Sequence, residues 1–138
     1  MRDRKLLGRS MVLAVVLTLG VVGCGGQSEV SRGGFTIFVH GGSLLPRGGE
    51  DALIEGTLTT GSECVLLQMV ESGAAYPVIW PSGTSIADDD PLALRLPSGE
   101  ELTVGRAVGG GGGFHQATSD RVDVDIPARC LPESGEVA

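Results

Sequence analysis

The feature that most constrains the fold is the absence, after residue 34, of any stretch of 12 or more residues with a helical period. Short apolar runs alternate instead with Gly, Pro, Ser and Asp, a pattern typical of strands and turns. The runs cover residues 35–40, 52–60, 64–70, 76–80, 92–96, 101–104 and 121–126. This pattern predicts an all-β domain, a small barrel or sandwich of about five to seven short strands, with an OB-like barrel among the alternatives.

Turn residues divide these runs at defined places. Pro97-Ser98-Gly99 lies between two alternating runs, which predicts a hairpin because proline presets the turn and glycine accepts a positive φ. Residues 62–73 have an alternative, since a capping serine, helix formers and a final glycine would also suit a short helix. The five glycines 109–113 lack the Lys and Ser/Thr of a phosphate-binding loop, and we expect a mobile loop or a close strand crossing there.

The N-terminal segment has a different character from the rest of the chain. A basic stretch over residues 1–10 precedes 12 residues, Met11 to Val22, that are almost entirely apolar. A membrane-spanning helix needs about 20 such residues. The length and the basic start are typical of a secretory signal peptide, so we expect the protein to be exported.

Val21-Val22-Gly23-Cys24, placed at the end of that apolar run, resembles the lipobox of bacterial lipoproteins. The resemblance covers residues 1–24 and implies cleavage between Gly23 and Cys24, with a diacylglyceryl (palmitate-bearing) group on the Cys24 thiol. Two acyl chains suffice for stable anchoring, whereas one chain binds a membrane reversibly. The body also looks like the small uncharacterised lipoproteins of high-GC bacteria.

These observations predict four segments. Residues 1–23 would be the signal peptide, 24–34 the lipidated cysteine and a flexible Gly-rich tether, 35–133 the β domain, and 134–138 a disordered tail. The expected location is the extracytoplasmic face of the cell membrane, reached through the lipid on Cys24.

The charge of the exported part excludes one class of function. Residues 24–138 contain six Arg, no Lys and 16 acidic residues, a net charge of −10. Nucleic-acid affinity depends on Lys and Arg that neutralise phosphates. We therefore expect no nucleic-acid partner.

The cysteine count predicts one disulfide. If lipid occupies Cys24, the remaining pair is Cys64 and Cys130, and an exported protein enters an oxidising compartment. No Cys-x-x-Cys or His-x-x-x-His spacing indicates a zinc site. We predict a Cys64–Cys130 bridge, no metal and no cofactor.

Few residues could support catalysis. His40 and His115 are the only histidines, and Asp120 or Asp123 could serve as an acidic partner for one of them. Asp88-Asp89-Asp90 lacks the spaced ligands of a calcium loop and reads as a solvated turn. The sequence contains no Gly-x-Ser-x-Gly elbow around a nucleophilic serine.

Together these patterns favour a lipid-anchored binding or structural module of the cell envelope over an enzyme. Two alternatives stay open. One is a small hydrolase with a His/carboxylate site, and the other is an accessory subunit of a transporter or envelope enzyme.

Overall fold

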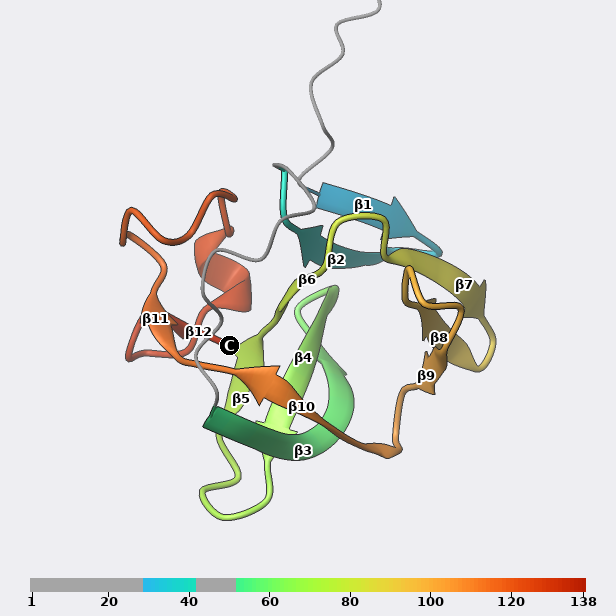
Figure 1. The fold of residues 1–138 in the computed structure, drawn as a ribbon, viewed down its shortest axis with the longest axis horizontal. Helices are drawn as coiled ribbons and strands as arrows, with labels where there is room; N and C mark the ends of the chain where they lie inside the picture. The colour runs from blue at the N-terminus through green and yellow to red at the C-terminus, as the bar shows by residue number, and fades with distance from the viewer. Residues whose placement is uncertain (1–28, 42–51) are drawn as a thin grey trace, which may run out of the picture.

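The computed structural model describes residues 29–41 and 52–138, and these form an all-β structure (Figure 1). The predicted signal peptide, Cys24 and the first residues of the predicted tether lie outside the described residues. The elements are β1 Glu29–Arg32, β2 Phe35–Val39, β3 Ala52–Gly61, β4 Cys64–Met69, β5 Ala75–Pro77, β6 Ile79–Trp80, β7 Ser85–Asp89, β8 Leu92–Arg95, β9 Glu101–Thr103, β10 Ala107–Gly112, β11 His115–Gln116, the 3₁₀ helix η1 Ala128–Cys130, and β12 Glu136–Val137.

The described strands form three sheets. The largest has seven strands in the order β1-β2-β4-β3-β10, with β5 added to β4 and β6 to β2. Strands β7, β8 and β9 form a second sheet, and β11 with β12 forms a third. These sheets do not close into a barrel, so the sandwich alternative of the predicted all-β class describes the fold.

Strands β2 and β4 lie at the centre because side chains on both of their faces are buried. Ile37 and Val39 of β2 point into a first core that also contains Leu94 of the three-stranded sheet. Phe38 points the other way, into a second core completed by the C-terminal segment. The first core contains Ile37, Val39, Ile54, Leu58, Val65, Leu67, Trp80, Ile86, Leu92 and Leu94, and the second contains Phe38, Cys64, Val124, Ile126, Cys130 and Val137. The large sheet is thus the middle layer between the β7–β9 sheet and the C-terminal segment.

The disulfide joins two of these layers. Cys64 begins β4 and Cys130 ends η1, with 5.8 Å between their Cα atoms, a usual span for a bridged pair. Both cysteines are buried in the second core. The predicted Cys64–Cys130 bridge is confirmed, and it fastens the C-terminal segment to the large sheet.

The hairpin predicted around Pro97-Ser98-Gly99 is confirmed. β8 and β9 pair antiparallel, and Gly99 has a φ of 91°. The helix alternative for residues 62–73 is wrong, because β3 and β4 instead pair through a two-residue turn at Ser62 and Glu63. Both turn residues have positive φ, 49° and 66°, which matches the twist of paired strands.

Two further expectations are wrong in detail. Residues 121–126 form no strand, although Val124 and Ile126 are buried and Asp123 and Asp125 are exposed as an alternating pattern predicts. The apolar side chains pack on the second core while the backbone stays irregular. Residues 109–112 form no loop but the second half of β10, which pairs with β3 from Ala107 opposite Thr57 to Gly112 opposite Ala52.

The domain is also longer than predicted at both ends. Residues 29–32, expected in the tether, form β1, which pairs with β2 across a turn at Gly33 and Gly34. Residues 134–138, expected to be disordered, include β12, whose Val137 is 1% exposed. Ala138 N–H donates to the Pro77 carbonyl at 2.9 Å, so backbone bonds and burial order the last residues.

Candidate functional site

The structure brings one histidine and one carboxylate together. His40 follows β2, and its backbone N–H donates to the Trp80 carbonyl at 3.0 Å. Asp123 lies next to the buried Val124 of the C-terminal segment, and its carboxylate points outward. His40 Nδ1 and Asp123 Oδ1 are 3.0 Å apart, although 83 positions separate them in the sequence.

The His40–Asp123 pair lies at the surface. The two side chains are 49% and 42% exposed. A carboxylate on Nδ1 orients the ring and leaves Nε2 to act as a base, as in a catalytic triad. Within residues 29–41 and 52–138, however, no hydroxyl or thiol forms a hydrogen bond to the ring. Among the residues that the structure describes, the pair therefore supplies the orienting half of a hydrolytic site, and no nucleophile is bonded to it.

The other acid/base candidates lie elsewhere. His115 is in β11, half-buried opposite Val137. Asp120 is exposed in the turn that follows β11. Of the four residues considered for a hydrolase, the structure pairs His40 with Asp123.

The aspartates 88–90 are exposed, but only Asp90 lies in the expected turn, because Asp88 and Asp89 form the end of β7 and pair with β8. Asp88 Oδ1 accepts the backbone N–H of Asp89 at 2.8 Å and that of Asp90 at 3.3 Å. These two bonds hold the pKa of the Asp88 carboxyl below its ordinary value, and the bond from Asp90 has the larger effect. Across the described ranges, no group of three His, Cys, Asp or Glu residues could hold a metal ion.

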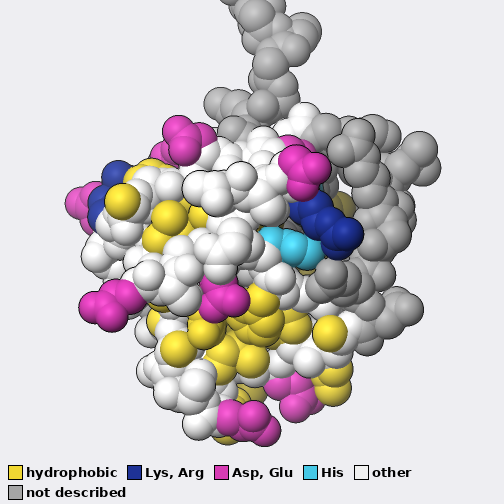
Figure 2. All heavy atoms as spheres, turned by 90° about the vertical axis from the view of Figure 1, so that its left-hand side faces the viewer, with side chains coloured by type: hydrophobic (Ala, Val, Ile, Leu, Met, Phe, Trp, Pro, Cys, Tyr) yellow, Lys and Arg dark blue, Asp and Glu magenta, His cyan; other side chains and the backbone are white. Residues whose placement is uncertain are grey.

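A second feature is an apolar surface that the sequence analysis did not identify. Tyr76 and Phe114 pack edge to face with ring centroids 4.9 Å apart. They line a shallow hollow of about 310 Å³ together with Met69, Glu71, Ser72 and Glu136. On the side of the molecule where β5, β11 and β12 lie, Figure 2 shows a continuous apolar area with carboxylates at its margin.

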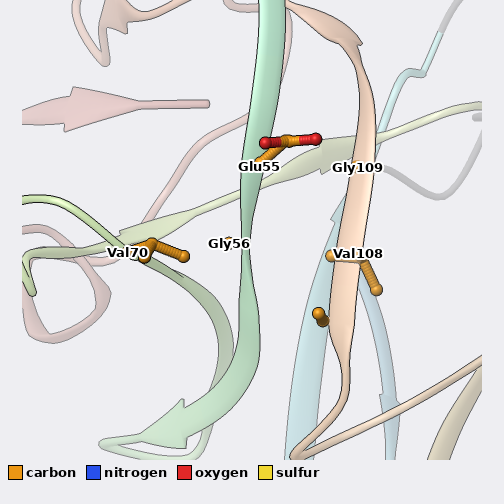
Figure 3. Close-up of a pocket in the computed structure, with 6 residues that line it drawn as sticks. Glu55, Gly56, Val70, Val108 and Gly109 are labelled. Atoms are coloured by element: carbon orange, nitrogen blue, oxygen red, sulfur yellow. The ribbon is translucent and has the colours of Figure 1, made fainter.

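A neighbouring hollow of about 340 Å³ lies over β3 and β10 (Figure 3). Val70 and Val108 contribute its apolar side chains and Glu55 its carboxylate. Val70 is 75% exposed and Leu53, on β3, is 72% exposed. Met69 and Glu71 line the first hollow, and Val70, between them in the sequence, lines the second. We call the lining residues Glu55, Val70, Val108 and Phe114, together with the exposed Leu53 of β3, the β10 surface.

The sequence contained a partial signal for this surface. Val70 follows the apolar run of β4, and its neighbour Glu71 shows that the run reaches solvent there. Leu53 is an apolar residue on the outward-facing side of an alternating strand, since Ile54 and Leu58 point into the core. Which outward residues become neighbours depends on the β3–β10 pairing, and a run of glycines has no side-chain pattern that predicts pairing.

Comparison with known proteins does not assign a family: no family description, curated protein or solved structure matches this chain. Among the described residues, no helix has the length and apolar character needed to cross a membrane.

Proposed function

We propose that the protein is a lipid-anchored binding module on the extracytoplasmic face of the cell membrane. The observation that carries the binding assignment is the β10 surface, where Val70 and Phe114 are exposed at open hollows and Leu53 is exposed on β3. Apolar side chains gathered on a small domain commonly mark an interaction site. The anchor rests on the lipobox resemblance at Cys24.

A β domain closed by a disulfide suits this role. Export leads to an oxidising compartment, and the Cys64–Cys130 bridge closes a 66-residue separation there. The two open hollows among the described residues suit a protein or peptide partner better than a small substrate. An accessory role beside a transporter or envelope enzyme would use the same surface.

Replacing Cys24 tests the anchor. Cys24→Ala should abolish incorporation of labelled palmitate and block maturation, because the only proposed attachment atom is lost. Ser28→Ala, four residues beyond the lipobox, is the matched control and should label normally. Palmitate labelling of Cys24→Ala at the wild-type level would overturn the proposed anchor.

The His40–Asp123 contact of 3.0 Å favours a second candidate, a small hydrolase. We expect the binding module to show no turnover on ester, peptide or glycoside panels. A robust rate that falls at least about a hundredfold in His40→Ala, and persists in His115→Ala, would replace the binding proposal with the hydrolase. The hundredfold criterion is the size of a typical acid/base contribution.

A further inference from the structure

The two outer strands of the large sheet differ in what covers them. Arg32 of β1 donates from Nη1 to the carbonyls of Ile86 and Ala87, at 3.2 and 2.9 Å, and so ties that edge to β7. In the part of the chain that the structure describes, β10 pairs with β3 on one side and with no strand on the other. Exposed strand edges are usually protected by charged side chains, proline or bulges, because they offer unpaired backbone groups. Residues 107–112, Ala-Val-Gly-Gly-Gly-Gly, carry no charge and no proline.

The hydrogen bonds at the start of β10 indicate which of its amides face outward. Leu58 N–H donates to the Arg106 carbonyl at 3.1 Å, and Gly105 N–H donates to the Leu58 carbonyl at 2.8 Å. Amide directions alternate along a strand. Counted from Arg106, the N–H groups of Ala107, Gly109 and Gly111 point away from β3 and can pair with an added strand.

The outer face of β10 also leaves room for the side chains of such a strand. Glu55 lies opposite Gly109 and Leu53 lies opposite Gly111. A Cβ on Gly111 would meet no atom within 4 Å. Long side chains on an added strand can therefore pass over these glycines to reach the neighbouring strand, as aromatic residues do when they cover glycines in a sheet.

We propose that β10 binds an extended peptide segment of a partner protein by strand addition. The segment carries a basic side chain for Glu55 and a large apolar side chain, two positions away on the same face, for Leu53. This proposal specifies the partner of the proposed binding function and rests on that function. The exposed edge of β10 itself does not depend on the proposed lipid anchor.

Charge favours a basic peptide over two other occupants, a second copy of the chain and an anionic membrane surface. A second copy would bring another strongly acidic domain, since residues 24–138 have a net charge of −10. An anionic membrane surface would meet Glu55, Glu71 and Glu136 around the two hollows. A basic, extended segment complements both the carboxylates and the free backbone groups.

The test uses the full-length protein and a fluorescein-labelled peptide, Val-Thr-Arg-Thr-Phe-Thr-Val, in fluorescence anisotropy. We expect saturable binding that weakens at least about tenfold when Glu replaces the peptide's Arg or when alternate peptide amides are N-methylated. Absence of binding by the wild-type protein, or equal binding of all three peptides, would overturn the proposal.

Two pairs of protein variants locate the site. Gly111→Pro removes an outward N–H and should weaken binding about tenfold, whereas Gly111→Ala keeps the N–H and should bind as wild type. Glu55→Gln should weaken binding about two- to fivefold, and Glu100→Gln, an exposed carboxylate before β9, should not. Equal binding by Glu55→Gln and wild type overturns the proposal even if Gly111→Pro fails to fold, which circular dichroism would reveal.

Three further results separate the alternatives. A dimer seen by sedimentation that persists in Gly111→Ala and is lost in Gly111→Pro, without peptide binding, would assign the edge to a second copy. If the protein binds phosphatidylglycerol vesicles but not the peptide, and Glu55→Gln strengthens the vesicle binding, the surface would be assigned to lipid. Peptide binding by a wild-type protein that takes up no palmitate would sustain this inference even though the lipid anchor had failed.

Discussion

Replacing both Cys64 and Cys130 by serine is expected to lower the free energy of unfolding by about 4 kcal/mol. In the chain-entropy model a bridge that closes a loop of this length restricts the unfolded chain by that amount. The folded state loses support as well, because both cysteines lie in the second core and fasten the C-terminal segment there. The loss is a large fraction of the free energy of unfolding of folded proteins, which is about 5–15 kcal/mol in general.

Urea unfolding followed by circular dichroism measures this effect. Cys24→Ser is compared with the triple replacement of Cys24, Cys64 and Cys130 by serine, so that both proteins lack the proposed lipid and differ only in the bridge. Adding reductant to the wild-type protein should reproduce the effect of the double substitution. A midpoint that changes with neither treatment would show that the bridge does not stabilise the domain.

The second large effect is expected at Phe38. Its side chain is fully buried in the second core, together with Cys64, Cys130 and the buried residues of the C-terminal segment. Phe38→Ala should cost about 3–5 kcal/mol, through lost burial and the cavity left behind. We expect the second core to loosen first, because Phe38 is its largest side chain.

Phe114→Ala is the control for Phe38→Ala. Phe114 is 38% exposed and makes one edge-to-face contact with Tyr76, so its replacement should cost about 1 kcal/mol. Urea unfolding of the two variants gives the comparison. If Phe114→Ala were the more destabilising, the β10 surface rather than the second core would be the more important packing region.

Much of the fold follows from local patterns in the sequence. Residues 92–104 have alternating runs around Pro97-Ser98-Gly99, and they form the predicted hairpin. The cysteine count predicts the bridge because only two cysteines remain once Cys24 is set aside. These features could be predicted because each depends on a few neighbouring residues or on a simple pairing rule.

Other elements depend on partners distant in the sequence. Ser62 and Glu63 adopt positive φ, although neither residue is glycine or asparagine, because the β3–β4 pairing imposes that turn. Val124 and Ile126 alternate as a strand would, yet they are buried without joining a sheet. Strand β10 consists largely of glycine, and its place is determined by backbone bonds to β3.

The candidate site likewise combines residues that the sequence identifies with contacts that only the fold provides. The sequence identified His40 and Asp123 as residues able to work together, and only the packing of the C-terminal segment brings them within 3.0 Å. The β10 surface could not be predicted, because Leu53, Val70 and Phe114 come from separate parts of the chain.

We propose one exported β domain that is anchored through Cys24 and closed by the Cys64–Cys130 bridge. Peptide mass mapping of the protein extracted from membranes without reductant tests it most directly. We predict an N-terminal peptide that begins at Cys24 and carries a diacylglyceryl adduct, together with a linked peptide pair containing Cys64 and Cys130. An N-terminal peptide that begins at Met1, with an unmodified Cys24 thiol, would contradict the claim.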